Sequence, residues 1–212
     1  MNKDEVYEKL RQDIITNLIL PGEMLNEKEL MKEFQIGRTP LREVFIRLQG
    51  EELLKSLPRL GYMVTVLDIS EVWELIELRR ELEGFVGSLA AKRINKDEIA
   101  ELKEILNSAE TEKQNQVSNH NITGDFDTRF HLVLYEVVQN RKLKKVLLEL
   151  NTNMLRIWFH KGFNKIDHNT RKDDLTLVLN ALEAGDSAKA KKALENHVEM
   201  FANQMNKKFM SE

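Results

Sequence analysis

The sequence predicts a mostly α protein that begins with three helices and a small β-hairpin and continues as an all-α bundle of about six helices. Two observations support this fold class. Apolar residues recur at the spacing of amphipathic helices along most of the 212 residues. Strand-like composition is confined to the short region LLKSLPRLGYMVTV, and no strand signal follows Leu67. We therefore expect two domains, residues 1–67 and residues 68–212, joined by a very short linker.

The composition is typical of a soluble cytoplasmic protein. The chain is 42% hydrophobic and 32% charged, and a chain of this length buries a substantial core. No apolar run approaches the roughly 18 residues of a membrane span, and the N-terminus MNKDEVYEKL lacks the apolar core of a signal peptide. The sequence contains no cysteine, which excludes disulfides and thiol chemistry. Any transition-metal site must therefore be built from histidine and carboxylate side chains.

The first two helices are defined by their stop and start signals. The first helix is expected to end at Pro21-Gly22, because proline cannot continue a helix. Asn26 is the predicted N-cap of the second helix, and Glu29 three residues later completes a capping box. The apolar residues that recur at helical spacing in the first helix are Val6, Leu10, Ile14 and Leu18.

A third helix and a hairpin complete the predicted first domain. Thr39 is expected to cap the third helix, and Pro40 suits its first position, where a missing N–H costs nothing. The segments LLKSLP and YMVTV are expected to form two short strands around a tight turn that contains Gly61. The predicted inward face of the third helix consists of Val44, Phe45 and Leu48.

Six helices with polar connections are expected in the second domain. The first of them is predicted to be capped by Ser70 and to face the core through an apolar stripe. That stripe consists of Val72, Leu75, Leu78, Leu82, Val86 and Leu89. The expected helices cover about residues 70–95, 97–117, 125–138, 143–160, 172–184 and 187–208.

The second and third helices of the first domain match the helix-turn-helix design, in which the second helix reaches base edges in the major groove. Arg38 and Arg42 lie about one turn apart in GRTPLREVF, so both can project from one face. Arginine is also the side chain best suited to bidentate pairing with guanine. The spacing alone leaves an alternative open, a packing unit whose arginines only face solvent. The formal net charge of −3 does not favour a polyanionic partner.

The first domain closely resembles the winged helix-turn-helix domain of the GntR family of bacterial transcriptional regulators, over the stretch LNEKELMKEFQIGRTPLREVFIRLQGEELLKSLPRLGYMV. The resemblance covers about residues 6–66, and its most specific parts are the Arg-Thr-Pro-Leu-Arg-Glu run and the Pro-Arg-x-Gly wing. It implies that the protein binds double-stranded DNA. The residues implied to contact the operator are Arg38, Thr39 and Arg42, with supporting backbone or wing contacts from Lys28, Arg59 and Gly61.

Three polar residues of the second domain have the pattern of a metal site. Asp127 and His131 stand four apart in DFDTRFHLVLYE, so both project from one face of a helix. His197 lies on the last helix between the inward-looking Leu194 and Phe201. A carboxylate and two imidazoles that converge inside a bundle suit Zn²⁺, Ni²⁺ or a similar ion. The alternative is that both histidines are core residues satisfied by backbone or carboxylate partners.

The second domain resembles the FCD effector-binding domain of the FadR-type branch of the GntR family. Many such domains bind a metal through an Asp-x-x-x-His pair and two histidines on the last two helices. The resemblance implies Asp127, His131 and His197 as ligands, but Leu175 stands where the further histidine is expected. Either three protein ligands bind the metal, with water or an effector oxygen completing the shell, or no metal is bound.

Further residues of the second domain extend this resemblance. His160 and His168 precede Leu175 in the chain, and either of them can compensate for the missing histidine. Arg79 in ELIELRRELEG matches an arginine that often faces the effector in this family. A buried guanidinium pairs naturally with an organic acid, so the implied effector is a small carboxylate. Arg80 is adjacent, and only one of the two arginines can point inward.

Together these expectations describe a ligand-responsive transcriptional regulator, more specifically a repressor. Two copies would form a homodimer through the helical domains and present two recognition helices to a roughly palindromic operator. The main alternative is a metal-dependent helical-bundle enzyme with an accessory winged domain, and a third is a protein–protein interaction module. The enzyme is disfavoured because the sequence has no Glu-x-x-His pair, no His-Glu-x-x-His motif and no glycine-rich phosphate loop.

Overall fold

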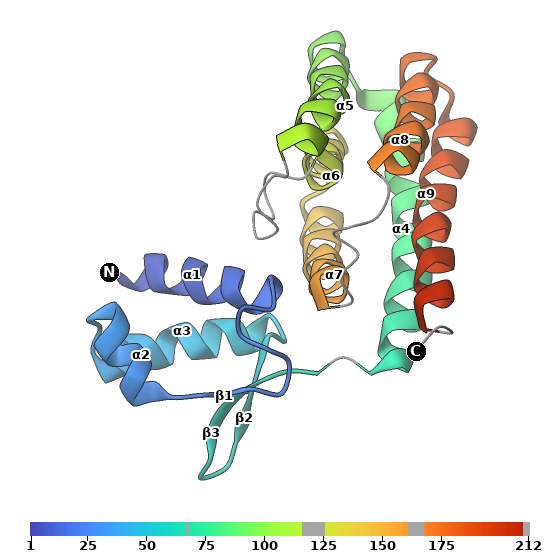
Figure 1. Ribbon diagram of the computed structural model, residues 1–212. Helices are drawn as coiled ribbons and strands as arrows, with labels where there is room; N and C mark the ends of the chain where they lie inside the picture. The colour runs from blue at the N-terminus through green and yellow to red at the C-terminus, as the bar shows by residue number, and fades with distance from the viewer. Residues whose placement is uncertain (67, 116–125, 161–167, 210–212) are drawn as a thin grey trace. The chain divides into compact units, whose positions relative to one another are not determined.

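The computed structural model describes residues 1–66, 68–115, 126–160 and 168–209 (Figure 1). The chain divides into two compact units. The first unit contains Met1–Ile69 and Thr152–Phe163, and the second contains Ser70–Asn151 and Asn164–Glu212. Within the described ranges, no helix combines the length and the apolar composition that crossing a lipid bilayer requires.

Three helices and a small antiparallel sheet form the N-terminal part of the first unit. The helices are α1 (Lys3–Ile15), α2 (Glu27–Phe34) and α3 (Arg38–Gly50). The strands are β1 (Met24–Leu25), β2 (Leu54–Leu57) and β3 (Gly61–Val64), and their order in the sheet is β1-β3-β2. Figure 1 shows the β2–β3 hairpin extending away from the helices. The sequence predicts this hairpin but not β1, because two residues are too few to show the alternation of a strand.

The core of the first unit is built from the faces that the sequence assigns to it, with one exception. Leu18 is 55% exposed, although its spacing places it on the apolar face of the first helix. Helix α1 ends at Ile15, before the predicted stop at Pro21, and Asn17 has a left-handed backbone with φ of 58°. The central buried residues include Val6, Leu10, Ile14, Leu41, Val44, Phe45, Leu48 and Val64.

Asparagine side chains cap α1 and α2. The side chain of Asn26 accepts hydrogen bonds from the N–H groups of Lys28 and Glu29, which confirms it as the N-cap of α2. A complete capping box occurs at α1, where Asn2 accepts from the N–H of Glu5 and the Glu5 carboxylate accepts from the N–H of Asn2. Both caps satisfy donors that an α-helix leaves without internal partners.

Helix α3 starts two residues earlier than predicted. It begins at Arg38 with Gly37 as its N-cap, so Thr39 is not the cap. The first helical bond of α3 runs from the N–H of Leu41 to the carbonyl of Gly37. Pro40 precedes this bond, in the turn where a missing N–H removes nothing. This start places Arg38 at the very beginning of the helix.

The second part of the chain is helical, as predicted. Helix α4 begins at Ile69, so Ser70 lies inside the helix rather than at its cap. Helix α8 begins at His168, four residues before the predicted start at Lys172. In the described ranges the six helices are α4 (Ile69–Arg93), α5 (Lys96–Asn115), α6 (Phe126–Val137), α7 (Arg141–His160), α8 (His168–Glu183) and α9 (Ser187–Phe209).

The buried face of α4 agrees only in part with the stripe that the sequence predicts. Val72 and Val86 are buried, and Leu82 and Leu89 are partly buried against the core. Leu78 is 48% exposed and the neighbouring Phe85 is 47% exposed. The face that points into the bundle is small or polar at several positions, and hydrophobic periodicity therefore does not identify it. Its residues are Val72, Ile76, Arg79, Glu83, Gly84, Val86, Gly87, Ala90 and Ala91.

Two glycines on this face allow α9 to lie close to α4, as Figure 1 also shows. A Cβ atom at Gly87 would lie 2.5 Å from the carbonyl oxygen of Ala190, and one at Gly84 would lie 2.8 Å from the side chain of Glu195. Neither distance is compatible with ordinary van der Waals contact. The close approach of α9 brings His197 into the interior of the bundle, where it is 8% exposed.

Candidate functional site

The first candidate site is an exposed polar surface at the N-terminal ends of α2 and α3. We call it the recognition surface, and it comprises Lys28, Arg38, Thr39 and Arg42, which are all exposed. The side chains of Arg38 and Arg42 are 65% and 50% exposed. The N-terminal turn of α3 also presents free N–H groups, which favour an anion such as a phosphate. The surface therefore combines exposed cationic side chains with backbone N–H donors.

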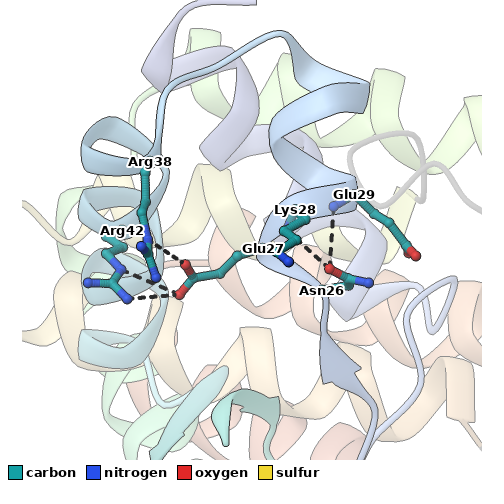
Figure 2. Close-up of polar contacts among 6 residues, drawn as sticks. All are labelled: Asn26, Glu27, Lys28, Glu29, Arg38 and Arg42. Carbon is teal, nitrogen blue, oxygen red and sulfur yellow. Dashed lines mark hydrogen bonds and ion pairs between the residues drawn. The ribbon is translucent and has the colours of Figure 1, made fainter. Parts of the chain in front are cut away.

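Glu27 joins the two arginines, and sequence reasoning missed it. Its Oε2 accepts a hydrogen bond from Nε of Arg38 at 3.2 Å, and its Oε1 accepts from Nε of Arg42 at 3.4 Å (Figure 2). The Glu27 side chain is only 19% exposed. The signal in the sequence was its position as the first residue after the cap Asn26, where an acidic side chain is common for helix-dipole reasons alone.

The wing residues predicted from the resemblance lie at the tip of the β2–β3 hairpin. Arg59 is exposed and has a left-handed backbone with φ of 66°. Gly61 has φ of 113°, a backbone conformation that residues other than glycine rarely adopt. Leu60 between them is 72% exposed. The turn thus presents one cation and one apolar side chain to solvent.

The second candidate site is a group of polar side chains in the interior of the bundle, which we call the buried polar cluster. Side chains from three helices meet there, and the carboxylate of Glu83 and the imidazole of His131 are fully buried. The members of the cluster are Arg79 and Glu83 on α4, Asp127, His131 and Tyr135 on α6, and His197 on α9.

The three residues predicted as metal ligands come together in this cluster. Ligand atoms of Asp127, His131 and His197 all lie within 4.8 Å of one another. Nε2 of His197 is 3.2 Å from Oδ1 of Asp127, although the two atoms are not aligned for a hydrogen bond. Both ring nitrogens of His131 and Nδ1 of His197 are also buried and have no hydrogen-bond partner among the residues that the structure describes. Buried polar atoms of this kind need a partner, and an aspartate with two imidazoles suits a divalent cation.

The charge state of Asp127 supports the same reading. Burial by itself favours the neutral carboxyl, but the neighbouring His197 and then His131 hold the pKa of Asp127 well below its usual value. Asp127 is therefore a carboxylate at neutral pH. An ionised carboxylate is the form that binds a metal ion.

Glu83 is the centre of the other half of the cluster, and no sequence signal identifies it. Its Oε1 lies 3.4 Å from Nε of Arg79 and 3.1 Å from Nδ1 of His131, and it accepts a hydrogen bond from the hydroxyl of Tyr135. Burial raises the pKa of the Glu83 carboxyl, but His131, Arg79 and Tyr135 outweigh burial and lower it to about 2. Glu83 is thus a buried carboxylate surrounded by donors.

Arg79 is the arginine that points inward. It is 9% exposed, whereas the side chain of Arg80 is 42% exposed and pairs with Glu81. Burial favours the neutral guanidine, but Tyr135 and Glu83 outweigh it and raise the pKa of Arg79. Its guanidinium is therefore charged, and Glu83 already occupies one of its nitrogens.

The position of the expected further histidine is part of the apolar core. Leu175 is fully buried and packs in the bundle's main hydrophobic cluster. Asp174 lies next to it, and burial raises the pKa of its carboxyl even though His197 acts in the opposite direction. The side chains of His160 and His168 lie outside the described residues, so their proposed compensation for Leu175 stays a prediction.

Comparisons with known proteins identify a family for each of the two parts of the chain. Residues 2–64 match the family of bacterial regulatory proteins called the gntR family, and residues 74–200 match the FCD domain. The uncharacterized HTH-type transcriptional regulator YdhC of Bacillus subtilis is 32% identical over 152 residues, which cover 69% of this chain and 65% of that protein. The HTH-type transcriptional repressor RspR of Escherichia coli is 25% identical over 202 residues, which cover 92% of this chain and 85% of that protein. Among solved structures, E. coli McbR/YncC has the same fold, with a TM-score of 0.82, 20% identity and 98% of each chain covered.

Proposed function

Since the chain belongs to the gntR family of bacterial regulatory proteins and carries an FCD domain, we propose that it is a transcriptional repressor whose operator affinity is controlled by a small carboxylate in the helical domain. The relatives are named as transcriptional regulators and repressors. They are not named as enzymes, which argues against the helical-bundle enzyme that the sequence left open. The observation that carries the proposal is the exposed pair of arginines at the start of α3.

The recognition surface has the composition needed to read a DNA duplex. Arg38 and Arg42 lie at the N-terminal end of the second helix of a helix-turn-helix, which is the end that approaches the bases. Arginine donates two hydrogen bonds to O6 and N7 of guanine, and such a pair discriminates between bases. Lys28 and Arg59 are also exposed, and their positive charges would attract the phosphates of the duplex. Thr39 and Gly61 complete the residues proposed to approach the duplex.

Substitution of the arginines tests the DNA-binding proposal. Arg38→Ala and Arg42→Ala are each expected to weaken binding to duplexes enriched from a randomised library by about tenfold to a hundredfold. Lys32→Ala is the matched control, because Lys32 is an exposed cation in the last turn of α2. Fluorescence anisotropy gives the affinities, and the unfolding midpoint checks the fold. Wild-type affinity in both arginine variants would refute the proposal.

We propose that the buried polar cluster binds a divalent metal through Asp127, His131 and His197. Bound there, such an ion would act as a Lewis acid that attracts an oxygen ligand. One guanidinium and one divalent cation against the carboxylates of Asp127 and Glu83 would leave a net positive charge when both imidazoles are neutral. This charge favours an anionic effector, and Arg79 is the donor that the protein itself offers to a carboxylate.

Metal content and thermal stability test the second proposal without a DNA assay. The protein dialysed against Zn²⁺ or Ni²⁺ is expected to retain about one ion per chain by elemental analysis, and its unfolding midpoint is expected to rise because the ion binds the folded state. His197→Ala is expected to abolish both effects. His160→Ala tests separately whether His160 replaces the missing histidine, in which case this variant also retains less metal. Equal metal content in the wild type and in His197→Ala would exclude this site.

We further propose that the leucine-rich face of α4 joins two copies of the chain. Leu78 and Phe85 are seven residues apart, half-exposed and on one face, and with Leu75, Leu82 and Leu89 they follow the alternating three- and four-residue spacing of packed helices. A symmetric dimer suits a palindromic operator. Leu78→Lys is expected to convert the dimer to a monomer in size-exclusion chromatography with light scattering, whereas Leu177→Lys, at a leucine 62% exposed on α8, is not. A dimer that survives Leu78→Lys unchanged would contradict this interface.

A further inference from the structure

We infer that Glu27 is a positioning residue, which holds Arg38 and Arg42 in one arrangement and thereby sets the base specificity of the recognition surface. The inference rests on the proposed role of the two arginines in reading the operator. Glu27 is the first residue of α2, and Arg38 is the first residue of α3. The helix-turn-helix geometry therefore brings the starts of two helices together around one carboxylate.

The carboxylate spans both arginines. Its Oε2 accepts from Nε of Arg38 at 3.2 Å, and its Oε1 accepts from Nε and Nη2 of Arg42, each at 3.4 Å (Figure 2). The Glu27 side chain is 19% exposed, against 65% for Arg38 and 50% for Arg42. The acid is thus the covered member of the group, and the guanidinium groups are its exposed members.

This arrangement leaves hydrogen-bond donors of both arginines available for the bases. Glu27 occupies only Nε of Arg38, so both terminal nitrogens of Arg38 stay available for O6 and N7 of one guanine. Glu27 accepts from Nε and from one N–H of Nη2 of Arg42, which leaves the other N–H of Nη2 and both N–H groups of Nη1 available for the bases. A free arginine samples many rotamers, and ordering them on binding costs affinity. Glu27 restricts the rotamers before DNA arrives.

The carboxylate also weakens binding to the wrong sequences. Two arginines and one glutamate carry a single net positive charge, which is less attractive to phosphates than two. Phosphate attraction supplies most of the non-specific affinity of a DNA-binding protein. Glu27 is therefore expected to lower the affinity for any duplex while raising the preference for the correct one, as expected of a residue that acts on specificity.

Glu27→Gln separates these effects when it is compared with Glu29→Gln. Glu29 lies on the same helix and is exposed, and Figure 2 shows its carboxylate directed away from the arginines. Both variants lose one negative charge. Affinities are measured for a duplex enriched from a randomised library by the wild type and for a scrambled duplex of the same composition. The unfolding midpoint of each variant confirms that the protein is folded.

In Glu27→Gln the ratio of the two affinities is expected to fall on the order of tenfold, through looser discrimination at the base pair that Arg38→Ala also affects. In Glu29→Gln the ratio is expected to stay at the wild-type value. An equal rise of both affinities in Glu27→Gln would overturn the inference, because Glu27 would then act only as a repulsive charge. A change confined to a base pair unaffected by Arg38→Ala and Arg42→Ala would also overturn it, because Glu27 would read that base itself. If the two arginine variants bind like the wild type, the proposed DNA contacts fail whatever Glu27→Gln does.

Discussion

Two carboxylates of this protein have similar partners and opposite surroundings. Glu27 accepts hydrogen bonds from two arginines at the surface, where the partners are at least half exposed. Glu83 lies among Arg79, His131 and Tyr135 in the interior, and its side chain is fully buried. Water and salt screen the charges of the first group. The charges of the second group interact at short range in the low dielectric of the protein interior.

The difference in burial decides what each group does. Exposed ion pairs contribute about 0–1 kcal/mol to folding, so the Glu27 group has little effect on stability and its geometry is available for binding. Removing one partner from a buried pair costs about 3–5 kcal/mol, because the remaining charge is left without compensation. We therefore expect the same chemistry to serve recognition at the surface and stability in the interior. Substitutions on each side can test that division.

The largest effect is expected from Glu83→Gln. Glutamine has nearly the same shape as glutamate, but it removes the carboxylate that pairs with the buried Arg79 guanidinium. The free energy of unfolding is expected to fall by about 3–5 kcal/mol. Urea denaturation followed by circular dichroism measures it. Glu81→Gln is the matched control, because the Glu81 side chain is 60% exposed and on the same helix, and it is expected to change stability by less than about 0.5 kcal/mol. Equal losses in the two variants would contradict the contrast.

The next effect is expected at the glycine that brings α9 close to the buried polar cluster. Gly87→Ala places a Cβ 2.5 Å from the carbonyl oxygen of Ala190, and backbone atoms must move to relieve this contact. Overpacking typically costs 1–3 kcal/mol, and the helix propensity of alanine offsets about 1 kcal/mol of it. We expect a net loss of up to about 2 kcal/mol in the same denaturation experiment.

Gly50→Ala is the matched control for this substitution. Gly50 also lies in a helix, but an added Cβ there meets nothing within 4 Å. The variant is expected to be more stable than the wild type by about 0.4–1 kcal/mol, because alanine restricts the unfolded chain. A stabilised Gly87→Ala would mean that α9 does not need the close approach to α4.

The two regions also differ in how far the sequence predicts them. The helices of the first unit carry strong local signals, such as the Asn26 cap and the apolar face of α3, and the structure confirms both. Local signals do not fix the start of α3, since Thr39 is as good a cap as Gly37 by residue type. They also miss Glu27, because its role depends on where Arg38 and Arg42 lie in space.

The buried polar cluster was predicted only in part. The spacing of Asp127 and His131 places both on one face of α6, and His197 lies between inward-looking residues of the last helix, so the sequence predicts that these three residues converge. Glu83 was not found, because a glutamate in a charged helix normally faces solvent and its burial depends on partners some 50 residues away in the chain. The same cause explains why the leucine stripe containing Leu78 was assigned to the core. Hydrophobic periodicity cannot identify a buried face that is polar.

Tyr7 of the first unit pairs with a carboxylate, and its contribution to stability is expected to depend on pH. It is 5% exposed, and its hydroxyl donates a hydrogen bond to Glu51. Burial and then this carboxylate raise the pKa of Tyr7 from 10.0 to about 12. The folded state therefore holds the phenolic proton more tightly than the unfolded state, and the resulting stability is present in full below about pH 10 and is lost as the pH rises towards 12.

Tyr7→Phe removes this titration. The difference in the free energy of unfolding between the wild type and Tyr7→Phe is expected to be constant from pH 8 to about 10 and to shrink between about pH 10 and 12. Chemical denaturation at a series of pH values gives both curves, and taking their difference removes the titration of other groups. A difference that grows with pH above 10 would show that the folded protein stabilises the phenolate instead.

The smallest effect on folding is expected from Glu27→Gln, although the same change is expected to alter DNA specificity. The substitution weakens exposed contacts of 3.2 and 3.4 Å to the two arginines, and it removes one negative charge from the first turn of α2. Together these contribute less than about 1 kcal/mol, and salt screens them. The stability difference from the wild type should therefore fall to zero near 1 M salt, where the Debye length is about 3 Å. The Glu83→Gln difference should persist there, because its partners are buried. If the Glu27→Gln difference also persisted in high salt, the contacts of Glu27 would stabilise the fold as buried contacts do. The contrast between an exposed and a buried carboxylate would then fail.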